Sequence, residues 1–298
     1  MDTPRAGYVA LVGRPNVGKS TLLNALVGQK VSIVAPKPQT TRHRIVGILN
    51  GDGFQAAFLD TPGLHRGSRS RLNQAMNRAA MASLVDADVV LLLVDAGRWT
   101  DEDAAALERV RDSGKPAILV VNKVDTVRPR ERLLPTIERL ASLHDFAAIV
   151  PVSALKRDNL GRLLAVLAPL LPEGEPLYPP DQVTDRSERF LAAEIIREKL
   201  TLVLQDELPY GITVEIERWS ETDDGRVEIA AVIWVERESQ RRIVIGEGGG
   251  MLKQVGRSAR LALNRVLGRR VHLELWVKVR EHWADSEAAL RQFGYDPE

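Results

Sequence analysis

The stretch Gly13-Arg14-Pro15-Asn16-Val17-Gly18-Lys19-Ser20 has the spacing of a phosphate-binding loop, and it directly follows an apolar run over residues 8–12. Such a run predicts a buried strand, which would bring the loop to the edge of a sheet. The glycines allow backbone N–H groups to approach a phosphate, and a helix over residues 19–27 would point its N-terminus at the same anion. The alternative is a Gly-rich turn that binds nothing.

Two further motifs follow apolar runs in the order that a nucleotide site requires. Asp60-Thr61-Pro62-Gly63 comes after the run 54–59, and Asn122-Lys123-Val124-Asp125 comes after the run 117–121. The first supplies a carboxylate for Mg²⁺, through a water, and a glycine N–H for the γ-phosphate. In the second, a carboxylate accepts two hydrogen bonds from guanine that adenine cannot donate. These motifs predict GTP and GDP as the nucleotides, with Mg²⁺ as the metal.

The residues expected at the nucleotide can be named. Ser153, Ala154 and Leu155 follow the run 148–152 and are expected to complete the base pocket. The predicted metal ligands are Ser20, Thr41 and Asp60, with Thr40 as the alternative to Thr41, and the predicted catalytic residues are Lys19, Thr41 and Gly63. The predicted nucleotide contacts are Gly13, Arg14, Pro15, Asn16, Val17, Gly18, Lys19, Ser20, Thr21, Asp60, Thr61, Pro62, Gly63, Asn122, Lys123, Asp125, Ser153, Ala154 and Leu155.

Hydrolysis is expected to be slow. Leu64 occupies the position where Ras-type enzymes carry a water-orienting glutamine, and a leucine side chain makes no hydrogen bond. Asn16 is a candidate ligand for K⁺, whose charge would replace an arginine finger, or else it is an amide that only stabilises the loop. The arginines after Leu64 are either an internal finger or solvated residues of a switch segment; they are Arg66, Arg69 and Arg71.

Length and composition fit an ordinary soluble protein with two domains. The chain has 298 residues and no cysteine, so disulfides and thiolate metal sites are excluded. We see no signal peptide and no apolar stretch near the roughly 20 residues of a membrane span, so we expect a cytoplasmic protein.

The alternation of strand and helix patterns up to residue 171 predicts an α/β domain with a doubly wound, mostly parallel sheet. Helices are expected after the phosphate loop and over residues 72–84, 101–111, 130–142 and 159–170. The proline-rich stretch 172–180 then predicts a semi-rigid linker. The expected organisation is a GTP-binding domain over 1–172, a linker over 173–187 and a second domain over 188–298.

The second domain has a different order of elements. It reads as a helix (188–204), two strands (211–220 and 226–237), a glycine loop (246–250), a helix (251–267) and a strand (272–279). Asp223-Asp224-Gly225 between the two strands is a hairpin turn signal. This α+β order is typical of a type II KH domain, which holds about four nucleotides of single-stranded RNA.

Charge distribution supports an RNA partner. The whole chain carries only +1, but residues 237–270 hold nine basic and two acidic side chains, a local charge of +7. The predicted RNA contacts are Ile245, Gly246, Glu247, Gly248, Gly249, Lys253, Arg257, Arg241 and Arg242. Trp219, Trp234 and Trp276 lie within strands, where we expect them to fill the core rather than stack on bases.

Several motifs together resemble the Era family of bacterial GTPases. They are the phosphate loop, Gln39-Thr40-Thr41-Arg42-His43-Arg44, Asp60-Thr61-Pro62-Gly63-Leu64-His65, Glu194-Ile195-Ile196-Arg197-Glu198-Lys199-Leu200 and His272-Leu273-Glu274-Leu275-Trp276-Val277-Lys278-Val279. The resemblance runs from the first strand to Tyr295. It implies a switch protein that hydrolyses GTP, binds the 3′ end of 16S ribosomal RNA and assists assembly of the 30S subunit, with GTP favouring the RNA complex.

The resemblance also implies peripheral association with the inner membrane, although this sequence shows no anchor. No DNA partner is expected, and the chain is expected to be a monomer. One departure is Glu247, where family members often carry a basic or amide residue, so the loop is expected to bind RNA through its backbone. The alternatives are a GTPase whose C-terminal domain binds a protein or a membrane surface, and a module that holds nucleotide only for structure.

Overall fold

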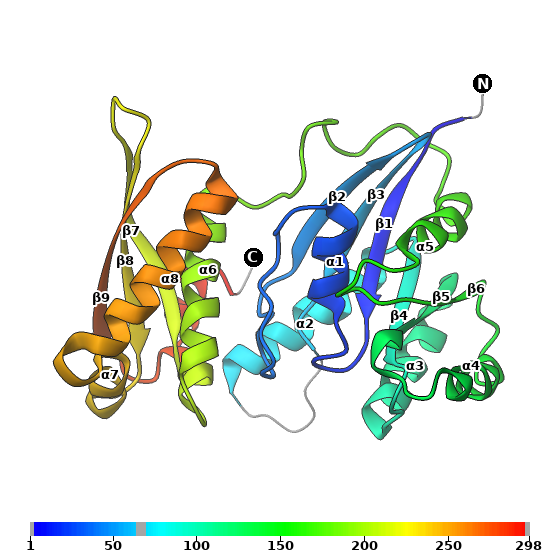
Figure 1. Cartoon of the computed structure of the whole chain (residues 1–298), viewed down its shortest axis with the longest axis horizontal. Coiled ribbons are helices and arrows are strands. Elements are labelled where there is room, and N and C mark those ends of the chain that lie inside the picture. The colour runs from blue at the N-terminus through cyan, green and yellow to red at the C-terminus, as the bar shows by residue number, and fades with distance from the viewer. Residues whose placement is uncertain (1–2, 64–69, 296–298) are drawn as a thin grey trace. The chain divides into compact units, whose positions relative to one another are not determined.

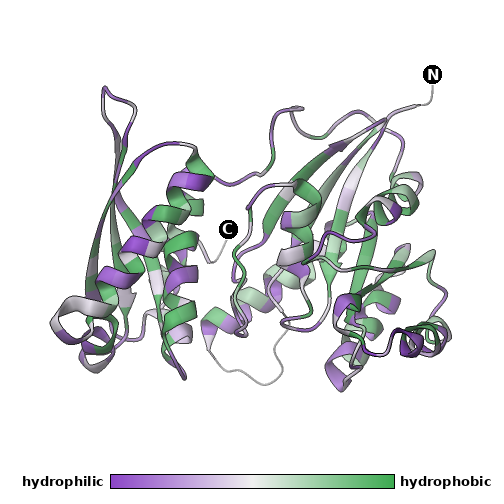
Figure 2. Ribbon diagram, viewed as in Figure 1, coloured by the Kyte–Doolittle hydropathy of each residue, from purple (hydrophilic) through white to green (hydrophobic). Residues whose placement is uncertain are grey.

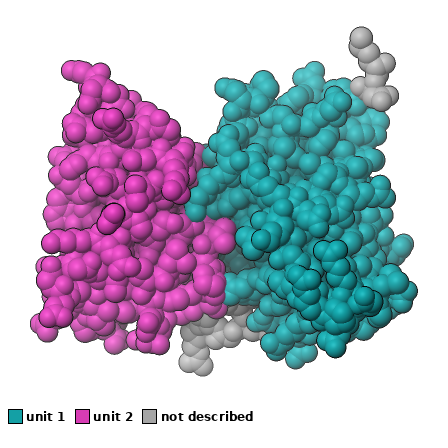
Figure 3. Space-filling view, in the orientation of Figure 1, with its two compact units in different colours: residues 1–32, 41–66, 76–185 teal, residues 33–40, 67–75, 186–298 magenta. Residues whose placement is uncertain are grey.

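The computed structural model describes residues 3–63 and 70–295. The chain forms two compact units, one from residues 1–32, 41–66 and 76–185 and the other from residues 33–40, 67–75 and 186–298 (Figure 3). Each unit contains its own β-sheet. In the described part of the chain, no helix is both long enough and apolar enough to cross a lipid bilayer.

The first unit is built on a six-stranded sheet with the order β2-β3-β1-β4-β5-β6 (Figure 1). Its strands are β1 (Arg5–Val12), β2 (Ile45–Gly51), β3 (Phe54–Asp60), β4 (Val89–Asp95), β5 (Ala117–Asn122) and β6 (Ala148–Pro151). Only β2 runs antiparallel to its neighbour, so the predicted doubly wound, mostly parallel sheet is confirmed. The parallel strands end at one edge of the sheet, where their loops are brought together.

Helices lie between the strands of this unit as predicted. They are α1 (Lys19–Val27), α2 (Arg71–Asp86, of which residues 71–75 belong to the second unit), α3 (Asp101–Ser113), α4 (Leu133–Ala141) and α5 (Leu160–Leu167). The helices predicted over 130–142 and 159–170 are shorter than expected, because a 3-10 turn replaces the start of the first and the end of the second. Pro169 has no N–H to continue the α-helical hydrogen bonds.

The core of the first unit follows from its apolar strands. Val90, Leu92 and Val94 of β4 pack in one cluster with residues of α3 and with Leu140 of α4. The strands appear green in Figure 2, as expected for strands with helices on both faces. The alternate side chains of β4, such as Leu91, are also fully buried. Two buried faces explain why these strands read as continuous apolar runs.

The stretch expected as a linker makes regular contacts with the first unit's sheet. The backbone N–H of Ile48 in β2 donates to the carbonyl of Val183 (2.9 Å). Gln55 exchanges two hydrogen bonds with the backbone of Tyr178 (2.9 Å each), and the Tyr178 hydroxyl lies 3.2 Å from that of Tyr8. The Ile48 hydrogen bond pairs one position of the otherwise open edge strand β2, and the first unit extends to Asp185.

The second unit holds a three-stranded sheet, β7-β8-β9, in which β7 and β8 are antiparallel and β8 and β9 are parallel. Its elements are α6 (Glu188–Val203), β7 (Thr213–Glu221), β8 (Val227–Val235), α7 (Glu238–Ile245), α8 (Gly250–Leu267), β9 (Val271–Val279) and α9 (Glu287–Gln292). The predicted order and the hairpin turn are confirmed. Two short helices, α7 and α9, were not predicted, because eight and six residues are too few to show a helical period.

Helices α6 and α8 cover one face of this sheet. Ile196 and Leu200 of α6 pack with Val255 and Ala259 of α8 and with alternate residues of the strands. In Figure 2, α8 shows both apolar and polar colours, as expected for a helix with one buried side. The prediction that Trp276 fills the core is wrong: its side chain is 44% exposed on the other face of the sheet. Val277, the next residue, takes the core position instead, because neighbouring strand residues face opposite sides.

Candidate nucleotide and RNA sites

The phosphate-binding loop connects the carboxyl end of β1 to the N-terminus of α1. Two of its glycines have positive φ angles, 153° at Gly13 and 107° at Gly18. A Cβ atom at Gly13 would lie 2.5 Å from the carbonyl oxygen of Leu93, and one at Gly18 would clash with the side chain of Asn122. Backbone angle and space therefore both require glycine at these positions.

Lys19 is buried at the start of α1. Its ammonium donates to the carbonyl oxygens of Gly13 (2.8 Å) and Arg14 (3.1 Å), which lie in the loop itself. Burial lowers the pKa of Lys19 to about 8, against the opposing effect of the nearby carboxylate of Asp60. A buried cation without a full counter-charge is ready to bind an anion.

Three hydroxyl groups gather around the carboxylate of Asp60 at the end of β3. The hydroxyls of Ser20 and Ser32 donate to its Oδ2 atom (2.6 and 2.8 Å), and the hydroxyl of Thr41 lies 2.9 Å from that of Ser20. Ser32 was not predicted, because a lone serine outside any motif carries no signal in the sequence. Oxygen atoms of this kind are the ligands that Mg²⁺ prefers.

The other oxygen of Asp60 supports a metal or water site. Oδ1 is buried, and no donor among residues 3–63 and 70–295 hydrogen-bonds to it. Burial raises the pKa of Asp60, although the hydrogen bonds from the two serines and the charge of Lys19 act in the opposite direction. A buried carboxylate with an unused oxygen fits a hydrated cation, whose charge would favour the ionised form.

Thr40 and Thr41 differ in their surroundings. The Thr40 hydroxyl donates to the carbonyl oxygen of Lys37 (2.6 Å), whereas the Thr41 hydroxyl contacts Ser20. Thr40 lies in the second unit, and its carbonyl there accepts a hydrogen bond from Arg197 of α6. Arg197 is itself held by both carboxylate oxygens of Glu194 (2.7 Å each).

The predicted base-recognition residues lie together at the ends of β5 and β6. The amide of Asn122 donates to the carbonyl of Val17 (2.9 Å) and accepts from the N–H of Ala154 (3.0 Å), so it joins two loops. Ser153 donates to one carboxylate oxygen of Asp125 (2.6 Å), and within the described residues no hydrogen bond is made to the other. The Leu155 side chain is exposed.

Two acidic residues that we did not predict support the phosphate loop. Asp95, at the end of β4, pairs with Lys123 (2.9 Å) and with Arg14 (3.6 Å), and Asp103 of α3 pairs with Arg14 (3.1 Å). Burial acts to raise the pKa of Asp95, but the hydrogen bond from Lys123 and other interactions hold it below its usual value. Asp95 could have been found, because it follows an apolar run in the same way as Asp60.

The remaining residues of the predicted switch lie partly outside the described chain. Leu64, Arg66 and Arg69 are among the residues that the structure does not describe. Arg71 pairs with Glu287, and its N–H donates to Asp285 (3.1 Å). These pairings favour a structural role for Arg71 over the arginine-finger alternative. Gly63 lies beside the phosphate loop, since a Cβ there would be 2.9 Å from the ring of Pro15.

The predicted RNA-binding loop lies between α7 and α8. Gly246, Gly248 and Gly249 all have positive φ angles (74°, 55° and 77°). A Cβ at Gly246 would lie 2.7 Å from that of Met251, whereas Gly248 and Gly249 have open space around them. The exposed backbone of this loop can therefore be approached closely, and the side chain of Glu247 is exposed beside it.

Most of the predicted basic contacts are available at the surface. Arg242, Lys253 and Arg257 are exposed, and within the described residues none of them is held in an ion pair. Arg241 is different, because it pairs with Glu238 (3.0 Å) and donates to the carbonyl of Val277. Ile245 is half-buried next to the loop. A basic helix beside a glycine loop is suited to a phosphate backbone.

Comparison with known proteins identifies the families of both units. Residues 8–123 match the family described as 50S ribosome-binding GTPase, and residues 207–284 match the KH domain family. The GTPase Era of Stenotrophomonas maltophilia is 52% identical over 296 residues, which cover 99% of each chain. This chain belongs to the Era family of GTPases. It is therefore a GTP-hydrolysing enzyme with a KH domain, as predicted.

Solved Era structures agree with the fold. An Era protein in complex with MgGDPNP and nucleotides 1506–1542 of 16S ribosomal RNA matches 99% of this chain with a TM-score of 0.94 and 43% identity. A variant of Aquifex aeolicus Era bound to GDP·AlF4⁻ matches 98% of this chain with a TM-score of 0.94 and 42% identity. Both alignments cover all of the compared chain. This member of the Era family therefore has the family's architecture in both units.

Proposed function

We propose that this chain is a GTP-dependent switch that binds the 3′ end of 16S ribosomal RNA and assists assembly of the 30S subunit. The observation that carries the proposal is the full-length similarity to an Era protein solved with nucleotides 1506–1542 of that RNA. The exposed glycine loop and the basic side chains of α8 support it from this chain's own residues. The family membership also supports a cytoplasmic protein.

We propose the predicted nucleotide contacts as the GTP site. Mg²⁺ would be held by Ser20 and Thr41 directly and by Asp60 through a water, where it would neutralise phosphate charge. The 2.9 Å contact between the Thr41 and Ser20 hydroxyls favours Thr41 over Thr40. Lys19 would exchange its two loop carbonyls for phosphate oxygens, and the N–H of Gly63 would bind the terminal phosphate.

We propose that a potassium ion bound by Asn16 compensates for the missing glutamine. The support is the position of Asn16 in the phosphate loop, where its φ of 60° is held by the hydrogen bond from Lys123 to its carbonyl (2.9 Å). Turnover in potassium chloride should exceed turnover in sodium chloride at matched ionic strength, and Asn16→Ala should remove the difference. Equal rates for the unaltered protein in both salts would refute the proposal.

The proposed RNA contacts are the glycine loop, Ile245, Arg242, Lys253 and Arg257, with Arg241 at the edge of the site. The test is binding of a fluorescent oligonucleotide carrying the 3′ end of 16S RNA, with a scrambled oligonucleotide of equal length as control. We expect the native sequence to bind at least about tenfold more tightly, because base reading adds to charge. Equal binding of both would favour the alternative, a domain that meets a protein or an anionic membrane. If the protein binds vesicles of anionic lipid and neither oligonucleotide competes with this binding, the partner of the C-terminal domain is a membrane surface.

A further inference from the structure

The β7-β8-β9 sheet has an outer face that the helices α6 and α8 do not cover. The C-terminal segment covers one end of this face, where Phe293 packs on Trp234 (6.2 Å between ring centroids) and the Tyr295 hydroxyl lies 2.9 Å from that of Thr213. Within the part of the chain that the structure describes, the C-terminal segment does not cover the strand positions further along the face in this way. Trp276, two residues from the covered end of β9, is 44% exposed.

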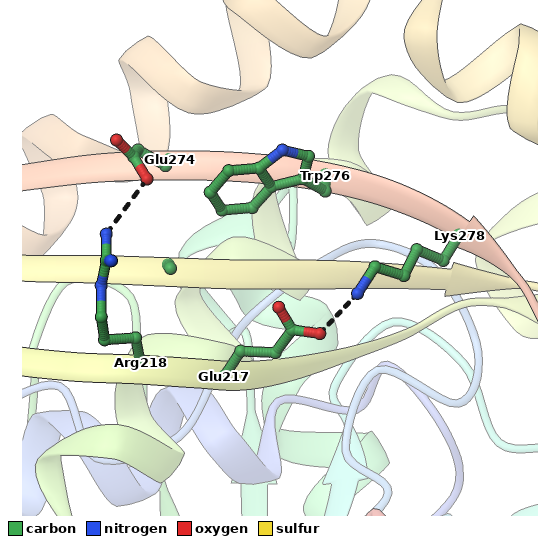
Figure 4. A pocket seen from close by; sticks show the side chains of 6 residues that line it. Glu217, Arg218, Glu274, Trp276 and Lys278 are labelled. Atoms are coloured by element: carbon green, nitrogen blue, oxygen red, sulfur yellow. Dashed lines mark hydrogen bonds and ion pairs between the residues drawn. The ribbon is translucent and has the colours of Figure 1, made fainter.

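A shallow pocket of about 350 Å³ lies around this tryptophan (Figure 4). Ala230 on the central strand β8 forms its floor, and Arg218 and Glu274 flank Ala230 on the neighbouring strands. The small side chain of Ala230 leaves the space that Trp276 borders. The indole lies between two ion pairs, Arg218–Glu274 (3.3 Å) and Lys278–Glu217 (2.6 Å).

The charge of the outer face selects the kind of partner. Its ionisable residues are Glu215, Glu217, Arg218, Glu228, His272, Glu274 and Lys278 of the strands and Arg226, which precedes β8 and pairs with Glu228 (3.6 Å), so four acids face three bases with histidine neutral. All three bases are paired with carboxylates, and the remaining acid, Glu215, accepts hydrogen bonds from Trp234 and Gln292. Among the described residues no base of this face is left unpaired for a phosphate backbone, whereas the indole face and the spare lone pairs of the carboxylates can accept a cation.

We propose that this pocket binds an arginine side chain of a basic protein segment. The planar guanidinium would stack on the indole of Trp276 and donate to the remaining lone pairs of Glu217 and Glu274. A carboxylate has about four acceptor sites, so each keeps capacity beyond its present partner. The pocket lies on the opposite face of the sheet from α8, so the segment and RNA would bind at separate surfaces. The proposal does not depend on the proposed RNA target.

The test uses the full-length protein labelled with 5-fluorotryptophan, with the Trp276 signal assigned by its loss in Trp276→Phe. A short glycine-spaced arginine peptide is titrated against the same peptide with citrulline in place of arginine, which keeps the shape and removes the charge. We expect the arginine peptide to shift the Trp276 signal and to bind roughly fivefold or more tightly than the citrulline peptide. Trp276→Phe should retain binding, measured by peptide fluorescence, and Trp276→Ala should lose it.

A second variant tests the carboxylates and guards against a folding defect of Trp276→Ala. Glu217→Gln with Glu274→Gln should remove the preference for arginine, whereas Glu221→Gln, outside the pocket, should keep it. Equal binding of arginine and citrulline peptides by the unaltered protein would overturn the proposal. So would a Trp276 signal that moves with a single-stranded oligonucleotide and not with the arginine peptide, which would make the pocket a base-stacking site.

Discussion

At the residue scale, the proposed GTP site contains buried charges that lack full partners among residues 3–63 and 70–295. Among the described residues, Lys19 has only carbonyl oxygens as hydrogen-bond acceptors, and the Oδ1 atom of Asp60 has no donor. The pKa of Lys19 is lowered to about 8 and that of Asp60 is raised, in each case chiefly by burial. Both shifts disfavour the charged form that the nucleotide and metal require. Ligand binding should therefore change protonation.

We expect GTP binding to take up protons above pH 8. Near about pH 8.5 most Lys19 side chains are neutral before binding, and the polyphosphate restores the charged form. Titration calorimetry in two buffers of different ionisation enthalpy should show uptake of a large fraction of one proton. At about pH 7, where Lys19 is already charged, this uptake should vanish, and GTP affinity should decline as the pH rises above 8. No net uptake at the higher pH would show that Lys19 keeps its charge in the free protein.

Asp125 offers a test of base choice. Ser153 donates a hydrogen bond to one of its carboxylate oxygens. Replacing the carboxylate by an amide would remove the negative charge that we propose accepts hydrogen bonds from guanine. Asp125→Asn should weaken GTP binding on the order of 100-fold, because a charge-assisted hydrogen bond is lost. The same variant should gain affinity for xanthosine triphosphate, whose 2-oxygen accepts from the new amide. Competition with a fluorescent guanine nucleotide measures both. Unchanged GTP affinity would remove Asp125 from the site.

At the element scale, the glycine loop between α7 and α8 combines exposed backbone with left-handed conformation. Gly248→Asp places a side chain and a second carboxylate beside Glu247, at a φ of 55° that most residues avoid. RNA affinity should drop roughly tenfold or more, since repulsion of phosphate adds to steric exclusion. GTP affinity should be unchanged, because no residue of the loop belongs to the first unit.

Gly225→Asp is the matched control for the loop variant. Gly225 has a φ of 75° and open space around it, and it lies in the hairpin turn between β7 and β8. The control adds the same charge and a similar backbone strain without touching the loop, so its RNA affinity should stay near that of the unaltered protein. If both variants bind the oligonucleotide normally, the RNA site lies elsewhere.

At the scale of the whole molecule, the chain passes from one compact unit to the other between two adjacent threonines. Thr40 belongs to the unit that contains the KH domain, and Thr41 belongs to the unit that contains the phosphate loop. The carbonyl of Thr40 is held by Arg197, and the hydroxyl of Thr41 contacts Ser20 at the proposed metal site. The peptide bond between these threonines therefore links the proposed metal site to a backbone position that α6 holds.

This arrangement predicts reciprocal coupling of GTP and RNA. If GTP tightens RNA binding, bound RNA must tighten GTP binding by the same factor. The measurement is GTP affinity with and without the 3′-end oligonucleotide, and RNA affinity with GTP analogue or GDP. Gly248→Asp should lose the effect of RNA on GTP affinity while keeping GTP affinity itself. A GTP affinity that is the same with and without saturating RNA would contradict the predicted coupling.

The sequence alone determined the order of the long elements and predicted the residues of the proposed nucleotide site, because both depend on local pattern. Each motif follows an apolar run, and parallel strands bring their carboxyl ends to one edge, so Asp60 and Asn122 could be placed without coordinates. The prediction that Asp125 selects guanine follows from hydrogen-bond chemistry. Short helices such as α7 and α9 were missed because they span too few residues to show a period.

Only the tertiary structure decided the contacts made between residues distant in the chain. Ser32 donates to Asp60, Lys123 pairs with Asp95 and Arg197 donates to the carbonyl of Thr40. None of these pairs has a sequence spacing that a motif or a hydrophobic period would reveal. The tertiary structure also turned Trp276 out of the core, because one position along a strand reverses the face. Local periodicity determines which elements form, whereas packing determines which side chains meet.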